Sequence, residues 1–259
     1  MPVLPLTALS LATALAYALL AFAHHRLSVR AAQLGFGAAW GLHAITLLSH
    51  WAGDVPRFGF ATALSLTCWL VLAVHAVESR LYPQLRTRWA LAALGSVSVL
   101  LSGVFPGAPF PDLPSAWLPL HWAFGMAAYG LIAAAVVHAW LMQRTERAIR
   151  QGLTHETGLP LLTIERLTFR FVTAGFGLLS ATLIAGVWFS ETVYAHLSWN
   201  HKTVFTALAW LTMGVLLLGR WRLGWRGRTA VRMLYAAAAL LLLGYVGSRF
   251  VLEVLLHRA

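Results

Sequence analysis

Eight long apolar runs, separated by short polar loops, extend through the whole of this sequence. They cover residues 4–23, 31–48, 60–77, 90–105, 117–141, 171–190, 203–218 and 230–250. A helix needs about 20 mainly apolar residues to cross the hydrocarbon core of a bilayer, where only helices and closed barrels satisfy their backbone hydrogen bonds. The runs therefore predict an all-α fold, a polytopic membrane bundle of eight transmembrane helices, with residues 1–259 as a single transmembrane domain.

The scarcity of charged residues also indicates a membrane protein. Only 10% of the 259 residues are charged, whereas a soluble domain carries about a quarter, so too few charges exist to cover a water-facing surface. A net charge of +11 would indicate nucleic-acid binding in a soluble protein. Here the basic residues lie in short loops beside apolar runs. We therefore expect the chain to interact with the lipid bilayer and not with nucleic acid.

The placement of arginine predicts the orientation in the membrane. The loops after the first, third, fifth and seventh runs hold all but four of the 19 lysine and arginine residues. The exceptions are Arg57, Lys202, Arg249 and Arg258. Because loops rich in lysine and arginine stay in the cytoplasm, we expect an even number of spans and both termini on the non-cytoplasmic side.

His121 is the first candidate ligand-binding residue. It begins the fifth run, and Gly125 and Tyr129 follow four and eight residues later on the same face of a helix. A glycine one turn below a histidine leaves room for a flat ligand against the backbone. The alternative is an interfacial histidine that anchors the helix end, and spacing alone leaves both interpretations open.

A second group of candidates lies between the sixth and seventh runs. Trp188 and Trp199 flank a polar loop, and His201 and Lys202 follow in the segment W-N-H-K. Aromatic rings beside a histidine and a lysine are able to hold a macrocycle and its carboxylate. The alternative is an aromatic belt with one snorkelling lysine, which is common at membrane interfaces.

His43 lies inside the second run, three residues after Trp40 and on the same helix face. Ionisable groups within a membrane are costly and face a cavity or a partner. The simpler interpretation is a hydrogen-bonded core histidine, with ligand binding as the alternative.

Residues 118–257 resemble a known family. His121 with Tyr129 is similar to its helix-opening histidine and tyrosine, and the segment at 199–202 is similar to its loop W-D-P-K-E. The segments at 224–228 and 245–247 match its G-W-R-G-R and Y-x-G spacing without gaps. On these residues the chain resembles the cytochrome c assembly proteins of the CcsA/CcmC type, which handle haem at the bacterial inner membrane. Its compact length is similar to that of the YpjD-type branch.

The resemblance implies a multi-pass carrier that holds haem at the outer membrane surface. Haem would rest against the loop from Trp188 to Trp199, with His121 as one axial ligand and His257 or His201 as the other. Two imidazoles fill both axial positions of the iron, which suits a carrier because no position is left for oxygen chemistry.

The same resemblance implies that Tyr129 binds the cofactor and that Lys202 pairs with a haem propionate. The implied partners are haem, apocytochrome and other assembly membrane proteins. No nucleophile–base pair is visible in the sequence, so we do not expect an enzyme.

The chain departs from the family pattern in ways that favour a second hypothesis. The loop's Asp, Pro and Glu are Asn200, His201 and Thr203. The family's buried histidine falls at Leu218, and its last outer histidine falls one residue before His257. The alternative is therefore a non-enzymatic scaffold or regulator that kept the fold and lost haem transfer. A transporter is a third possibility, disfavoured because no paired broken helices are visible.

Overall fold

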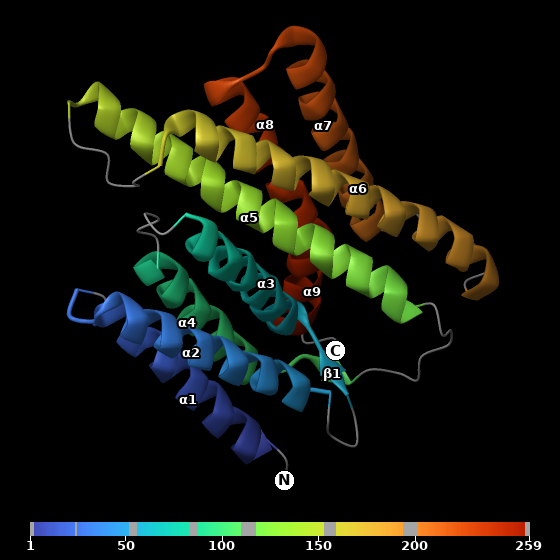
Figure 1. Cartoon of the computed structure of the whole chain (residues 1–259). Helices are drawn as coiled ribbons and strands as arrows, with labels where there is room; N and C mark the ends of the chain where they lie inside the picture. Colours follow the sequence, from blue (N-terminus) through green and yellow to red (C-terminus); the bar gives the residue numbers. More distant parts are fainter. Residues whose placement is uncertain are drawn as a thin grey trace. The chain divides into compact units, whose positions relative to one another are not determined.

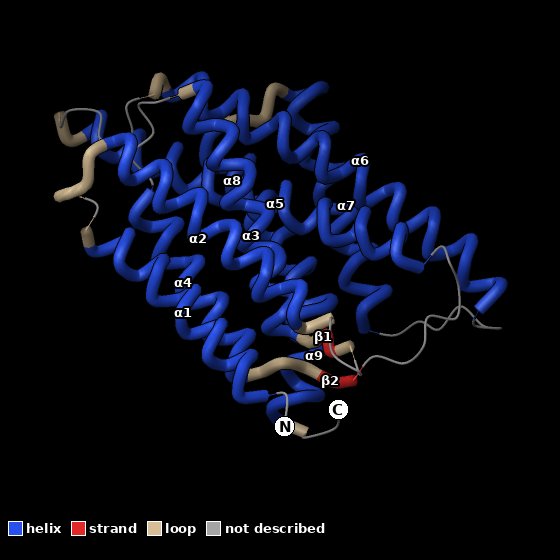
Figure 2. Tube along the Cα trace, turned by 60° about the horizontal axis from the view of Figure 1, so that its bottom comes forward, coloured by secondary structure: helices blue, strands red, loops and turns tan. Residues whose placement is uncertain are grey.

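The computed structural model describes residues 3–23, 25–51, 56–82, 88–109, 118–152, 159–193 and 201–256. The chain divides into two compact units. The first unit holds four helices, α1 (Val3–Phe22), α2 (Val29–Ser49), α3 (Phe60–Leu81) and α4 (Arg88–Val104). It also holds two short strands, β1 (Arg57–Phe58) and β2 (Ala108–Pro109), and the C-terminal segment from Arg249. These elements confirm the prediction of a helical fold, to which the strands add one antiparallel pair (Figure 2).

Small residues let α1 and α4 approach each other closely in the first unit. A Cβ atom at Gly95 would lie 3.2 Å from the ring of Tyr17, and one at Gly103 would lie 2.8 Å from the side chain of Ser10. The hydroxyl of Ser96 donates a hydrogen bond of 2.9 Å to the carbonyl of Ala14. Close backbone approach at small residues and hydroxyl bonds between helices are the usual means of helix association in a bilayer.

A buried polar network joins three helices of this unit. His43 of α2 is fully buried, and its Nε2 lies 2.8 Å from the hydroxyl of Ser65 on α3. Its Nδ1 lies 3.4 Å from the hydroxyl of Tyr17 on α1, which is also fully buried. The prediction of a hydrogen-bonded core histidine is confirmed, because both ring nitrogens have partners within the unit.

Two tryptophans connect α2 to α3. The rings of Trp40 and Trp69 stack with their centroids 4.5 Å apart. Each indole N–H donates to the backbone carbonyl of the other residue, at 3.1 Å in both directions. The pair therefore satisfies two indole donors that would otherwise be unpaired in an apolar environment.

The second unit contains the remaining long helices. They are α5 (Leu118–Arg150), α6 (Leu161–Val193), α7 (His201–Leu223) and α8 (Gly227–Leu242), followed by the π-helix η1 (Leu243–Gly247). Helices α5 and α6 lie side by side, and a tight turn joins α7 to α8 (Figure 1). The chain then continues through α9 (Ser248–Phe250) and a second π-helix, η2 (Val251–Leu255).

Six helices within the described residues are long and apolar enough to cross a membrane. They are Val29–Ser49, Phe60–Leu81, Pro119–Arg150, Leu161–Gly186, His201–Leu223 and Gly227–Leu255. The apolar helices Thr7–Phe22 and Trp89–Val104 are shorter. The chain is thus an all-α, multi-pass membrane protein.

Helices α5 and α6 are longer than the apolar runs predicted. Each has 33 residues, which corresponds to about 50 Å, whereas the hydrocarbon core is about 30 Å thick. Helix α5 continues nine residues beyond position 141 because the added segment has charged helix formers and no Gly or Pro, including an i,i+4 ion pair between Glu146 and Arg150. Helix α6 begins directly after Pro160, which is favoured before or within a first turn.

Candidate functional site

His121 lies in the first turn of α5 and its ring rests against α6. A Cβ atom at Gly186 would lie 3.3 Å from Cε1 of His121 and 3.8 Å from its Nδ1, so only glycine leaves the imidazole in this position without a shift. Nδ1 is buried and makes no hydrogen bond of standard geometry among the described residues, although the imidazole lies close enough to the backbone of Thr182 on α6 to interact with it. A buried ring nitrogen without a well-formed hydrogen bond calls for an explanation, and a ligand at this position is one.

Gly125 and Tyr129 face neighbouring helices. A Cβ atom at Gly125 would lie 3.5 Å from the methyl group of Thr182, so α6 covers this part of α5. The hydroxyl of Tyr129 donates to the backbone carbonyl of Leu241 on α8, at 2.5 Å. Tyr129 therefore connects α5 to α8, about two helical turns from His121.

The start of α7 packs against the π-helix η1. His201 is the first residue of α7 and is exposed. The ammonium group of Lys202 lies 5.6 Å from the ring centroid of Tyr245 in η1, a distance typical of a cation–π contact. A Cβ atom at Gly244 would lie 3.2 Å from the hydroxyl of Thr206, which explains a glycine there. A π-helix of one turn within an α-helix is frequent at functional sites.

Further along α7 from its first turn, an aromatic side chain contacts α6. The indole N–H of Trp210 donates to the hydroxyl of Ser180 at 2.8 Å, and its ring stacks on Phe176 with centroids 5.5 Å apart. Neither Ser180 nor Phe176 was expected from the sequence to have this role. Their spacing of four residues on one helix face was the available signal.

The sequence-predicted residues that the structure describes make two separate sets of contacts. His121 in the first turn of α5 lies against Gly186 of α6, and Lys202 in the first turn of α7 lies against Tyr245 of η1. Trp199 and His257 lie outside the described residues, as does the side chain of Trp188. Among the side chains that the structure describes, no group of three or more His, Cys, Asp or Glu residues converges as a metal site. A haem iron needs at most two protein ligands, so this finding leaves the prediction of His121 and His257 as iron ligands untested.

Known proteins resemble this chain over nearly its whole length. The family model described as Cytochrome C assembly protein matches residues 4–256, which extends the resemblance from 118–257 to the N-terminal half. The chain is 30% identical over 253 residues to a 28.8 kDa protein of Azospirillum brasilense, covering 91% of this chain and 92% of the relative. It is 24% identical over 219 residues to the cytochrome c biogenesis protein CcsA of Microcystis aeruginosa, covering 74% and 67%.

A shorter match has higher identity. The inner membrane protein YpjD of Escherichia coli is 36% identical over 96 residues. The aligned part is 37% of this chain and 36% of YpjD, so the match spans about a third of that relative. No solved structure matches the chain significantly.

Proposed function

The chain belongs to the cytochrome C assembly protein family, and from this premise we propose that it is a haem-handling protein of the bacterial inner membrane. Haem is held at the outer surface, at the end of the second unit where α5 and α7 begin. The observation that carries the proposal is His121, whose ring rests against Gly186 and whose buried Nδ1 makes no hydrogen bond of standard geometry among the described residues.

Each predicted residue has a different role in binding haem. His121 would hold the haem iron, together with His257 or His201. Trp188 and Trp199 provide the aromatic surface, and Lys202 neutralises a propionate. Tyr129 positions the start of α5 through its bond to the Leu241 carbonyl. Bound haem with both axial positions filled is a cargo rather than an oxygen-activating centre.

We further propose that both units form one transmembrane domain of eight spans, with both termini on the non-cytoplasmic side. Nine of the arginines in the second unit lie near the α5–α6 and α7–α8 connections, as the positive-inside rule requires of cytoplasmic ends: Arg144, Arg147, Arg150, Arg166, Arg220, Arg222, Arg226, Arg228 and Arg232. Single cysteines at positions 57 and 222, labelled from either side of sealed vesicles in a Cys68→Ser background, should react from opposite sides.

A protein that holds haem at the membrane surface needs a partner that receives the haem. Apocytochrome, or another assembly membrane protein that carries the reactive thiols, is the expected recipient of the haem. The thiols have to come from such a partner because the single cysteine of this chain, Cys68, is buried within α3.

The axial role of His121 gives a direct test. We expect the purified wild-type protein to show a Soret band after haem loading, and His121→Ala to lose most of it. The reason is that the variant removes an iron ligand while leaving a small residue that the helix tolerates. Absorption spectra of both proteins, loaded with equal haem in detergent, measure the effect.

A pair of glycine substitutions supplies the control. Gly186→Ala pushes on the imidazole, because its methyl group would lie 3.3 Å from Cε1, and should shift or weaken the Soret band. Gly177→Ala is on the same helix with nothing within 4 Å of its Cβ position, and should leave the spectrum unchanged. An absent band in wild type, or an unaltered band in His121→Ala, would rule out the axial role.

One observation favours the alternative of a scaffold or regulator without haem transfer. Leu218, which stands where the family has its buried histidine, is 55% exposed on α7. An apolar side chain directed outward suits lipid and provides no ligand. If the alternative holds, His121→Ala will restore a deletion strain as well as wild type does.

A further inference from the structure

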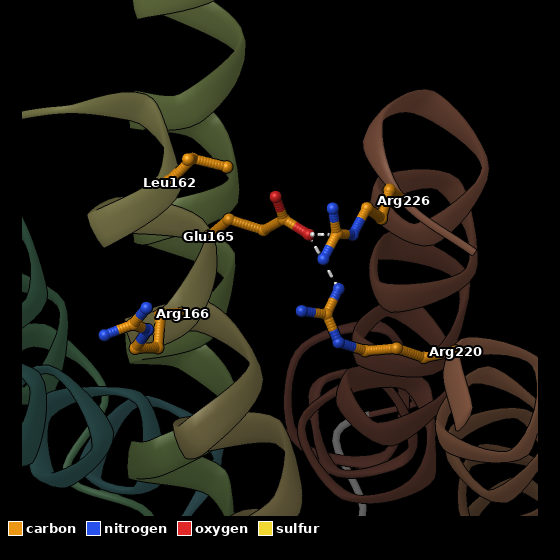
Figure 3. Close-up of a pocket in the computed structure, with 5 residues that line it drawn as sticks. All are labelled: Leu162, Glu165, Arg166, Arg220 and Arg226. Carbon is orange, nitrogen blue, oxygen red and sulfur yellow. Dashed lines mark hydrogen bonds and ion pairs between the residues drawn. The ribbon is translucent and has the colours of Figure 1, made fainter. Parts of the chain in front are cut away.

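A pocket of about 220 Å³ lies at the other end of the second unit, away from His121. It is lined by Leu162, Glu165 and Arg166 of α6, by Arg220 of α7 and by Arg226 (Figure 3). Arg226 immediately precedes α8. The pocket therefore lies where the amino end of α6 meets the turn between α7 and α8.

One carboxylate oxygen organises two of the guanidinium groups. Oε1 of Glu165 accepts a hydrogen bond of 2.7 Å from Nη1 of Arg220 and lies 3.4 Å from Nε of Arg226. Arg220 also lies over the ring of Phe169, with its Cζ 3.5 Å from the ring centroid. Because Glu165 and Arg220 are held on two sides, the carboxylate serves to position the cations.

The turn between α7 and α8 presents Arg226 to the pocket. Gly224 and Gly227 both adopt positive φ, +65° and +55°, which favours glycine. Trp225 folds back so closely on Gly219 that no side chain fits there, and its amide donates to the Gly219 carbonyl at 3.2 Å. This geometry determines where Arg226 emerges.

The pocket has an excess of donors and of positive charge. Three arginines and one carboxylate line it, and two of the guanidinium groups contact that carboxylate. The Arg226 side chain is 66% exposed and contacts Glu165 through Nε. Arg166 makes no ion pair or hydrogen bond within the described residues of this pocket, and Figure 3 shows its guanidinium turned away from Glu165. Arg226 is also the N-cap of α8 and forms no side-chain cap hydrogen bond, so the first N–H groups of that helix lack a side-chain acceptor.

We propose that this pocket binds a phosphate group carrying net negative charge, as in an anionic phospholipid headgroup. Forked guanidinium donors are groups that bind phosphate in proteins. Leu162 on the rim is 66% exposed, which provides apolar contact for the part of a lipid next to its phosphate. Clustered arginines at a membrane surface attract anionic lipids. This inference is independent of haem.

Native mass spectrometry of the full-length protein, released from detergent micelles, tests the proposal. The probes are short-chain phosphatidylglycerol, short-chain phosphatidylcholine and inorganic phosphate at equal ionic strength. We expect wild type to retain phosphatidylglycerol and to discriminate against the choline headgroup, whose cation the pocket repels. Arg226→Gln and Arg166→Gln should each weaken retention about tenfold, since a hydrogen bond to a charged group contributes that much.

Two variants control for the loss of charge alone. Arg222→Gln removes a guanidinium from the last helical turn of α7, where it lies over the Trp221 ring at 4.5 Å and does not line the pocket. Arg170→Gln does the same one turn along α6. Both should bind as wild type does. Arg166→Gln breaks no ion pair with Glu165, so it remains informative if Arg226→Gln folds poorly.

Each outcome decides the question. Retention of phosphatidylglycerol alone supports a lipid headgroup, and retention of inorganic phosphate with the same response to the variants supports free phosphate as the source. Equal retention of the choline lipid, or equal losses in the control variants, would overturn the pocket as a phosphate site.

Discussion

Replacing Gly219 by alanine is expected to lower the free energy of unfolding by about 1–3 kcal/mol, the range for overpacking a well-filled site. The added Cβ would lie 2.5 Å from Cδ2 of Trp225, at the centre of the indole rather than at a movable tip. The ring has little freedom to retreat, because the Trp225 amide is bonded to the Gly219 carbonyl. The turn from Gly224 to Gly227 must therefore shift.

Thermal unfolding in detergent measures this effect, and trypsin cleavage at the arginines of the turn reports the local displacement. Gly214→Ala is the matched control on the same helix, because its Cβ would meet the ring of Phe176 at an ordinary 3.7 Å. Alanine is a better helix former than glycine, so Gly214→Ala should be neutral or stabilising. Equal stability of the two variants would contradict the close contact between Gly219 and Trp225.

His43→Ala is expected to destabilise the first unit by about 3–5 kcal/mol, as a cavity and two unpaired hydroxyl groups are left in its core. The imidazole is fully buried and contacts Ser65 and Tyr17 through its two nitrogens. Both hydroxyl groups are fully buried, so an unpaired hydroxyl left by the substitution is costly.

The temperature of unfolding, followed by circular dichroism, provides the measurement for His43. His43→Gln retains one donor and one acceptor and should recover part of the stability. His25→Ala, at an exposed position outside the helices, is the control and should unfold as wild type does. A His43→Ala protein that is as stable as His25→Ala would show that the network contributes nothing.

Much of the secondary structure follows from the sequence, because apolar length and helix formation are local properties. All eight predicted runs correspond to helices, and the run at 60–77 begins at the residue where α3 begins. The apolar runs placed the C-terminal end of α5 too early and the N-terminal start of α6 too late. The reason is that an apolar run stops at the first charges, whereas a helix continues through arginine and glutamate. The π-helix η1 was not predicted, because the segment 245–247 was considered only as a match to the Y-x-G spacing of the family.

The candidate site was predictable in residue type and less so in its contacts. The helical period places Gly125 below His121, yet the residue that meets the imidazole is Gly186 on another helix. Likewise, membrane orientation alone accounts for Arg220 and Arg226 in the sequence. The structure shows in addition that both pair with Glu165, one of only eight acidic residues in the chain.

What the sequence by itself determined is a helical membrane chain with its arginines at alternate connections, because both properties depend on each segment and the bilayer. Only the tertiary structure decided that His121 faces Gly186, that His43 completes a network, and that Glu165 draws two arginines into a pocket. The physical reason is that lipid and neighbouring helices offer equally apolar surfaces. Periodicity therefore shows which residues share a helix face, whereas shape and hydrogen bonding select the helix that covers it.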